Sequence, residues 1–214
     1  MKFVPEPVPA GQVATQLWVM LPGAYMKPAD FVEAGFVKAV RDRRLPHDIA
    51  LLEASIAEVA DGSALAFLQD YLRAQAIFTG TVRLLGISLG AHLAMSCLAR
   101  ANLDAAAQAA AHRVDGALLL APYLGPRDIV AQVAAGAPLA QGDIDREIWH
   151  WLRRGPGGGC ELHLGYGSDD RFAGAHALMA GLLPAGHVDV QPGGHAWPVW
   201  TALWNRHLDH FHAA

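Results

Sequence analysis

The chain has 214 residues, of which 53% are hydrophobic and 17% are charged, and its formal net charge is −4. This composition excludes disorder over most of the length, and the length suits one α/β domain with its own hydrophobic core. The small acidic net charge, with no basic stripe, argues against nucleic acid or an anionic membrane surface as the main partner.

Apolar strand-like runs alternate with helix-like runs along the chain. Six strands are predicted, at residues 16–21, 48–53, 81–85, 114–123, 160–166 and 187–190. Helices are predicted at residues 31–43, 57–77 with an interruption near Gly62, 89–100 with an Ala-rich extension to about 112, 172–182 and 197–211. Asp30 is the expected N-cap of the first helix, with Glu33 as its capping-box partner. Strands that alternate with helices indicate a mostly parallel sheet with helices on both faces.

No repeat or linker divides the sequence, so a single α/β domain over residues 1–214 is expected. Residues 155–159 read Gly-Pro-Gly-Gly-Gly, which is typical of a short surface loop. Residues 124–155 hold one or two short helices that could overhang a site, and they leave no room for a large lid.

Neither export nor membrane insertion is predicted. Residues 1–12 contain prolines and no apolar stretch like that of a signal peptide, and no run approaches the ~18 apolar residues of a membrane span. The two cysteines, Cys97 and Cys160, lack the spacing of a zinc site or a disulfide framework, and Cys97 reads as a small core residue. We therefore expect a protein of the reducing cytoplasm.

Residues 86–90 read Gly-Ile-Ser-Leu-Gly and match the G-x-S-x-G pattern of a nucleophile elbow. A predicted strand precedes this run and a predicted helix follows it, which is the context that the motif requires. The glycines leave space for a strained strand-to-helix turn at Ser88. The alternative interpretation is a simple Gly-Ser turn between a strand and a helix.

Two later turns supply the residue types that a nucleophilic serine needs. Asp169 and Asp170 follow the strand at 160–166, and His195 follows the last strand in a Gly-Gly-His turn. Ligands of open parallel sheets bind at the carboxyl ends of the strands, where all these candidates fall. Their order, Ser then Asp then His, fits a nucleophile, an orienting acid and a base. Either aspartate could instead cap the following helix, and Glu53 at another strand end is a lesser rival.

From about Gln16 to His212 the sequence resembles the α/β-hydrolase superfamily, and most of all its small lidless bacterial serine esterases. Residues 194–200, Gly-His-Ala-Trp-Pro-Val-Trp, are similar to the ending found in the esterase D and S-formylglutathione hydrolase group. The resemblance implies that Ser88 is the nucleophile and His195 the general base and acid. It favours Asp170 as the orienting carboxylate, since the family's turn reads Gly-x-x-Asp.

The sequence departs from this group in two ways. Ala196 stands where the group usually carries an acid. The chain is also shorter, so we expect it to lack the first two antiparallel strands.

The same resemblance implies an oxyanion hole built from two backbone amides. One belongs to Leu89, directly after the nucleophile, and the other to the loop after the first strand, where Ala24 is the candidate. Pro22 replaces the histidine that many relatives carry in this loop. Four nearby residues suit a substrate pocket: Tyr25, Met26, Tyr123 and Trp197.

The predicted reaction is hydrolysis of a carboxylic ester with a small or short acyl group, through an acyl-enzyme. The expected partner is a small-molecule ester, and no cofactor or metal is required. A thioesterase or acyltransferase on the same triad is the enzymatic alternative. A catalytically silent binding protein of the same fold is the alternative from another class.

Several further residues keep two interpretations. His92 could line the pocket or face neighbouring elements from its helix, and Arg171 could bind an acidic substrate group or form a surface ion pair. The C-terminal histidines read as a solvated helix face rather than a metal cluster: His207, His210 and His212. Three tryptophans at helical spacing read as core packing: Trp197, Trp200 and Trp204.

Overall fold

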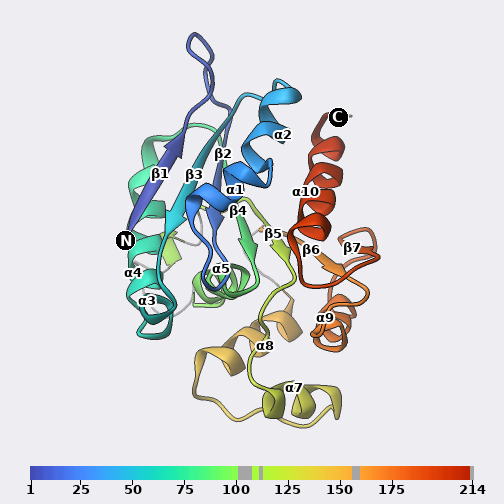
Figure 1. The fold of residues 1–214 in the computed structure, drawn as a ribbon. Coiled ribbons are helices and arrows are strands. Elements are labelled where there is room, and N and C mark those ends of the chain that lie inside the picture. The colour runs from blue at the N-terminus through green and yellow to red at the C-terminus, as the bar shows by residue number, and fades with distance from the viewer. Residues whose placement is uncertain (101–107, 111–112, 156–159, 213–214) are drawn as a thin grey trace.

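The computed structural model describes residues 1–100, 108–110, 113–155 and 160–212. A seven-stranded sheet runs through the molecule in the order β1-β3-β2-β4-β5-β6-β7 (Figure 1). Its strands are β1 (Lys2–Glu6), β2 (Gln16–Leu21), β3 (His47–Glu53), β4 (Thr81–Ile87), β5 (Gly116–Leu120), β6 (Glu161–Gly167) and β7 (Val188–Gln191). All neighbouring pairs are parallel except β1 with β3.

The prediction of six strands is wrong by one, because β1 was not recognised. β1 contains Pro5 and is followed by Pro7, and proline within such a run argues against a strand in the interior of a sheet. A strand at the edge of a sheet tolerates proline, since one side of its backbone needs no partner, and β1 pairs only with β3. The expectation that the first two antiparallel strands are both lacking is therefore also wrong, since β1 is antiparallel to its neighbour.

The helices follow the predicted alternation with some breaks. They are α1 (Pro28–Glu33), α2 (Phe36–Asp42), α3 (Ile56–Ala60), α4 (Ser63–Ala74), α5 (Leu89–Ala99), α7 (Arg127–Ala134), α8 (Ile144–Arg154), α9 (Ala173–Ala180) and α10 (Trp197–His212), with a 3-10 turn η1 (Gln75–Ile77). The interruption near Gly62 is confirmed, because Gly62 has a φ of 83° between α3 and α4. Most of the predicted Ala-rich extension to residue 112 lies outside the described residues.

The first predicted helix differs from the observed one in two respects. It is split into α1 and α2 at Gly35, which has a φ of 85°. Asp30 does not occupy the N-cap; it lies inside α1, and its carboxylate accepts a hydrogen bond from the Lys27 amide at 2.7 Å. Asp30 thus still satisfies a free amide at the helix start, but from a position inside the helix.

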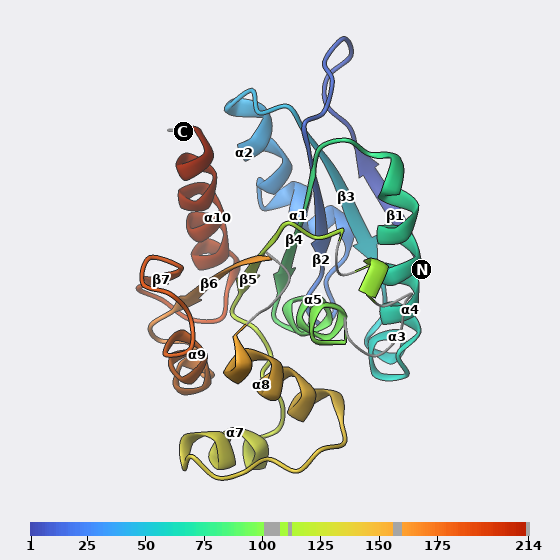
Figure 2. The same ribbon diagram turned by 180° about the vertical axis from the view of Figure 1, so that it is seen from behind.

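Helices cover both faces of the sheet. α2 and α10 pack together on one face, where Trp204 Nε1 donates to the Phe36 carbonyl at 3.0 Å (Figure 1). α4 and α5 cover the opposite face (Figure 2). Every residue of β2 and β5 is buried between these layers, and so is Cys97 in α5. Of the three tryptophans predicted to pack in the core, Trp200 is 3% and Trp204 0% exposed, and Trp197 packs against the core while partly buried.

α7 and α8 lie beyond the carboxyl ends of the parallel strands, where the overhang from residues 124–155 was predicted (Figure 1). Within the part of the chain that the structure describes, no helix has both the length and the apolar character needed to cross a membrane.

His47, the first residue of β3, couples folding to pH. It is 5% exposed, and burial, together with the charges of Arg41 and Arg83, lowers its pKa to about 4. The unfolded chain takes up a proton near the ordinary pKa of about 6.5, whereas the folded protein does not until the pH approaches 4. The contribution of His47 to stability is therefore complete above about pH 6.5 and is lost as the pH falls towards 4.

We predict that acidification from about pH 7.5 to about pH 4.5 destabilises the protein, with His47 alone contributing about 3 kcal/mol. Replacing His47 with Gln should remove that share, because glutamine binds no proton in either state. Urea unfolding of both proteins at the two pH values measures the difference. An equal loss of stability in wild type and His47→Gln would contradict this assignment.

Candidate active site

Ser88 stands at a strained turn between β4 and α5. Its φ of 53° and ψ of −108° lie in a region that residues with a side chain rarely adopt. Backbone hydrogen bonds hold it there: its amide donates to the Leu120 carbonyl at 2.8 Å, and its carbonyl accepts from the Tyr123 amide at 3.0 Å. Such strain persists only where the surroundings over-determine it, and it marks Ser88 as a functional candidate.

The two glycines of the elbow are required by close backbone contacts. A Cβ at Gly86 would lie 2.4 Å from the Ala91 Cα, and one at Gly90 would lie 2.1 Å from the Leu21 carbonyl oxygen. Both distances are far inside van der Waals contact. The end of β2 and the start of α5 can therefore approach the elbow only because these positions carry no side chain.

Asp170 and His195 meet across the turns that follow β6 and β7. The His195 Nδ1 lies 2.7 Å from Asp170 Oδ2, and the other Asp170 oxygen accepts from the Phe172 amide at 2.9 Å. The Asp170 side chain is fully buried, whereas the His195 side chain is 17% exposed. The ring of His195 stands edge-on to the rings of Phe172 and Trp200, with centroids at 5.6 and 5.0 Å. The imidazole orientation is thus fixed by one carboxylate and two aromatic rings.

Asp169 has a different partner. Its carboxylate accepts from the Gly193 amide at 3.0 Å, and its own amide donates to the Gly193 carbonyl at 2.9 Å. A Cβ at Gly167 would lie 2.1 Å from the same Gly193 oxygen, so glycine is needed for the two turns to touch. Of the two neighbouring aspartates, Asp170 contacts the histidine and Asp169 holds the turn that carries it.

The rival acid Glu53 lies elsewhere in the sheet. It ends β3 and forms a surface ion pair with Lys2 at 3.3 Å. β3 lies on the far side of β2 and β4 from β6 and β7, so Glu53 is separated from His195 by the width of the sheet.

The amides expected to form an oxyanion hole belong to segments beside the elbow. Leu89 is the first residue of α5, and the amides of a first helical turn have no partner within the helix. Leu21 and Pro22 pack directly against Gly90, which brings the loop that carries Ala24 next to the elbow. Ala24 is exposed, and the neighbouring Gly23 amide donates to the sulfur of Met26 at 3.2 Å.

The four residues expected to line a pocket have different environments. Tyr25 is 91% exposed and has a φ of 64°, and Met26 is half-buried against the Gly23 amide. Trp197 packs against Phe31 and Phe36, with ring centroids at 5.6 and 5.7 Å. Tyr123 lines a groove beside the elbow.

That groove, here called the α7–α9 groove, has a volume of about 460 Å³ and lies between α7 and α9. It begins next to the elbow and His195, because it is lined by Tyr123, whose amide binds the Ser88 carbonyl, and by Phe172, which contacts the His195 ring. Its lining includes Val130, Ala131, Leu178, Arg127 and Arg171. The groove is therefore mostly apolar, with two guanidinium groups at its walls.

Arg171 does not form the surface ion pair that was its alternative interpretation. Its guanidinium carbon lies 4.8 Å from the centroid of the Phe172 ring, and among the described residues no carboxylate lies within ion-pair distance of it. Its charge therefore faces the α7–α9 groove without a fixed counter-ion.

His92 is buried one turn after Ser88 and faces α8. Its Nδ1 lies 3.7 Å from Asp145 Oδ1, and its ring contacts Tyr123 with centroids 5.4 Å apart. Burial lowers the pKa of His92 and raises the pKa of Asp145, so both groups are held towards their neutral forms. The two side chains meet where α8 packs against α5.

The sequence alone does not point to two polar residues near the site, the partly buried Asp145 and the buried His176. His176 is 0% exposed, donates from Nε2 to the Pro122 carbonyl at 3.0 Å, and lies beside the Asp170 turn with its ring 5.1 Å from that of Tyr166. Burial lowers its pKa. Helical periodicity alone carried no signal for either residue, because their partners come from distant segments.

The C-terminal histidines do not all form a solvated face. His210 is exposed as expected, whereas His207 is half-buried and its ring lies 4.9 Å from that of His163. Burial and neighbouring charges lower the pKa of His207 to about 3. The side chain of His212 lies outside the described residues.

Comparison with known proteins identifies the fold. No family model matches the sequence, and no curated protein sequence does. Solved structures match over nearly the whole chain. A thermophilic esterase of Thermogutta terrifontis, solved with butyrate bound, has a TM-score of 0.67 at 15% identity and covers 98% of this chain and 87% of its own.

Two proteins of Staphylococcus aureus are also similar over nearly the whole chain. An S-formylglutathione hydrolase has a TM-score of 0.62 at 11% identity and covers 94% of this chain and 82% of its own. A fluorophosphonate-binding serine hydrolase has a TM-score of 0.61 at 11% identity, and the match covers 95% of this chain and 86% of its own. Together with the strand order, these likenesses show that the chain has the α/β-hydrolase fold, as the sequence predicted.

The close approach at the elbow makes a prediction about stability. Replacing Gly90 with Ala should destabilise the protein by about 1–3 kcal/mol, because the added methyl group displaces the Leu21 carbonyl or shifts α5. Gly174 in α9 is a matched control, since nothing lies within 4 Å of a Cβ added there. Gly174→Ala should be neutral or stabilising by up to about 1 kcal/mol. Thermal unfolding of both variants tests this, and equal effects would contradict it.

Proposed function

We propose that the protein is a serine hydrolase that cleaves carboxylic esters with small or short acyl groups through an acyl-enzyme. Ser88 acts as nucleophile, His195 as general base and acid, and Asp170 as the acid that orients the histidine. The observation that carries this proposal is the pairing of a buried carboxylate with the histidine, Asp170 Oδ2 to His195 Nδ1 at 2.7 Å, at the same sheet edge as a strained elbow serine.

Each group has a defined chemical step. Ser88 Oγ attacks the ester carbonyl carbon while His195 Nε2 takes its proton, and the imidazolium then gives that proton to the departing alcohol. Water repeats the sequence on the acyl-enzyme and releases the acid. Asp170 accepts the Nδ1–H, which leaves the lone pair on Nε2, and its negative charge stabilises the imidazolium.

The developing oxyanion is held by the amides of Leu89 and Ala24 in this proposal. A preorganised donor of this kind contributes roughly 3–4 kcal/mol to transition-state stabilisation. The positive end of the α5 dipole points to the same place, since Leu89 begins that helix.

The α7–α9 groove is the proposed binding place for the apolar part of the substrate. Its lining, with Val130, Ala131 and Leu178, suits a short hydrocarbon chain, and its volume of about 460 Å³ limits the size. The three similar proteins described above are an esterase, an S-formylglutathione hydrolase and a serine hydrolase, which supports ester or thioester chemistry.

A thioesterase or acyltransferase is the second candidate, since the same triad can pass its acyl group to another acceptor. A binding protein without catalysis would have the same fold but an unreactive serine.

An activated serine should react covalently with a fluorophosphonate probe. We expect strong labelling of the wild type and none of Ser88→Ala. Ser168→Ala is a matched control that should label normally, because Ser168 is an exposed turn residue and, within the described residues, its hydroxyl bonds to no histidine, lysine or arginine. If folded wild type does not label, the hydrolase proposal is overturned in favour of a binding protein. Turnover of p-nitrophenyl esters of increasing chain length then defines acyl preference.

The two neighbouring aspartates should differ sharply in function. Asp170→Asn should lower kcat for p-nitrophenyl acetate by about 10⁴-fold, because an amide there favours the wrong tautomer of His195. Asp169→Asn should cost less than about tenfold, since its amide oxygen can still accept the Gly193 hydrogen bond. A larger loss from Asp169→Asn than from Asp170→Asn would reverse the assignment.

A further inference from the structure

A second cavity, of about 290 Å³, opens at the amino ends of β6 and β7. Asp170 and His195 follow the carboxyl ends of the same two strands, so the cavity and the candidate active site lie at opposite ends of β6 and β7. Its lining is rich in side chains that can ligate metal ions: Glu161, His163, His187, Asp189, His207 and His210. The proposed hydrolytic mechanism uses none of them.

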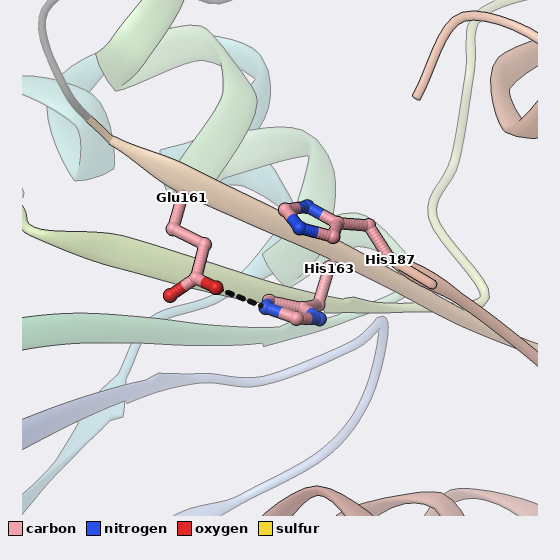
Figure 3. A group of neighbouring side chains, drawn as sticks. All are labelled: Glu161, His163 and His187. Atoms are coloured by element: carbon pink, nitrogen blue, oxygen red, sulfur yellow. Dashed lines mark ion pairs between the residues drawn. The ribbon is translucent and has the colours of Figure 1, made fainter. Parts of the chain in front are cut away.

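Three of these residues bring their donor atoms together. One ligand atom each from Glu161, His163 and His187 lies within 4.8 Å of the other two. Figure 3 shows the carboxylate and both imidazole rings gathered beside β6 and the start of β7. Glu161 and His163 are two residues apart on one strand and so share a face, and the β6–β7 register, with Leu164 opposite Val188, sets His163 opposite His187.

A backbone contact prepares His187 to act as a ligand. Its Nδ1 lies 2.9 Å from the Leu162 carbonyl oxygen, which can only accept, so Nδ1 carries the hydrogen. The lone pair of the neutral ring is therefore on Nε2. Metal-binding histidines are oriented by such a hydrogen bond from their other ring nitrogen.

Glu161 is oriented from both of its oxygens. Oε1 accepts from His163 Nε2 at 3.0 Å, and Oε2 accepts from Arg83 Nη1 at 3.1 Å. Arg83 holds the carboxylate in place and offsets its charge, so a cation here would depend mainly on the two imidazoles. This favours a borderline-soft ion such as Zn²⁺ over Mg²⁺ or Ca²⁺, which bind oxygen ligands and are usually held by negatively charged carboxylates.

We propose that Glu161, His163 and His187 form a binding site for a divalent transition-metal ion, with Zn²⁺ the ion that the ligand set fits best. On binding, the metal takes the place of the hydrogen on His163 Nε2, and that hydrogen moves to Nδ1, so the ring remains neutral. In the structure the two rings stack at an interplanar angle of 14° with centroids 4.5 Å apart. Metal binding therefore requires the His163 ring to turn, so that both Nε2 lone pairs point at one ion. The cavity leaves room for a water as fourth ligand.

Zinc titration by calorimetry, with metal analysis after dialysis, tests the site. We expect one Zn²⁺ per wild-type chain and at least about 100-fold weaker binding in His163→Gln and His187→Gln, because loss even of an outer partner costs 10–100-fold. Glu161→Gln should also weaken binding, and its 42% exposed side chain can change without disturbing the packing. His150→Gln, a histidine of α8, and Ser88→Ala should bind as the wild type does.

Co²⁺ supplies a readout independent of affinity. Wild type should give the intense visible absorption of four- or five-coordinate cobalt, and Glu161→Gln should change that spectrum while its circular dichroism stays native. The proposal is overturned if wild type binds Zn²⁺ no tighter than about 1 mM, or if the cobalt spectrum matches that of the hydrated ion. Unchanged affinity in both histidine variants would overturn it too. Because Ser88→Ala should lose fluorophosphonate labelling but keep Zn²⁺ binding, the metal experiments and the test of the proposed hydrolase can fail independently.

Discussion

The close approach of three backbone segments at Ser88 is the constraint on which the candidate active site depends. Gly90 lies against the Leu21 carbonyl and Gly86 against Ala91, so the end of β2, the end of β4 and the start of α5 can hold only one mutual arrangement. That arrangement sets Ser88 at its positive φ and brings the loop after β2 beside it. Ser88, the proposed nucleophile, is thereby held in place by backbone packing rather than by side-chain contacts.

A second backbone contact fixes the other half of the site. Gly167 and Gly193 touch at the ends of β6 and β7, and Asp169 fastens that contact with two hydrogen bonds. This leaves Asp170, in the turn after β6, fully buried with both oxygens accepting hydrogen bonds, and leaves His195, in the turn after β7, partly exposed. A buried carboxylate in such a position holds an imidazole firmly, because rotation of either group would leave a charge without a partner.

β6 and β7 carry a polar cluster at each end, and the two clusters differ in chemistry. The carboxyl-end cluster pairs one carboxylate with one histidine and leaves a single imidazole nitrogen for proton transfer. At the amino ends, two imidazoles and a carboxylate share a cavity, and the Leu162 carbonyl fixes the tautomer of one ring. The first arrangement fits the proposed proton transfer and the second fits the proposed cation site, and the two clusters lie at opposite ends of β6 and β7.

The sequence by itself determined the alternation of strands and helices, the elbow and the order of Ser88, the Asp169–Asp170 pair and His195, because hydrophobic period and glycine spacing are local properties. It did not indicate β1, because proline within a run argues against a strand everywhere but at a sheet edge. The resemblance favoured Asp170 over the adjacent Asp169, and the tertiary structure then separated the two by the partner that each meets. It likewise decided the burial of His207 and the meeting of His163 with His187, because strand register and helix packing join residues far apart in the chain.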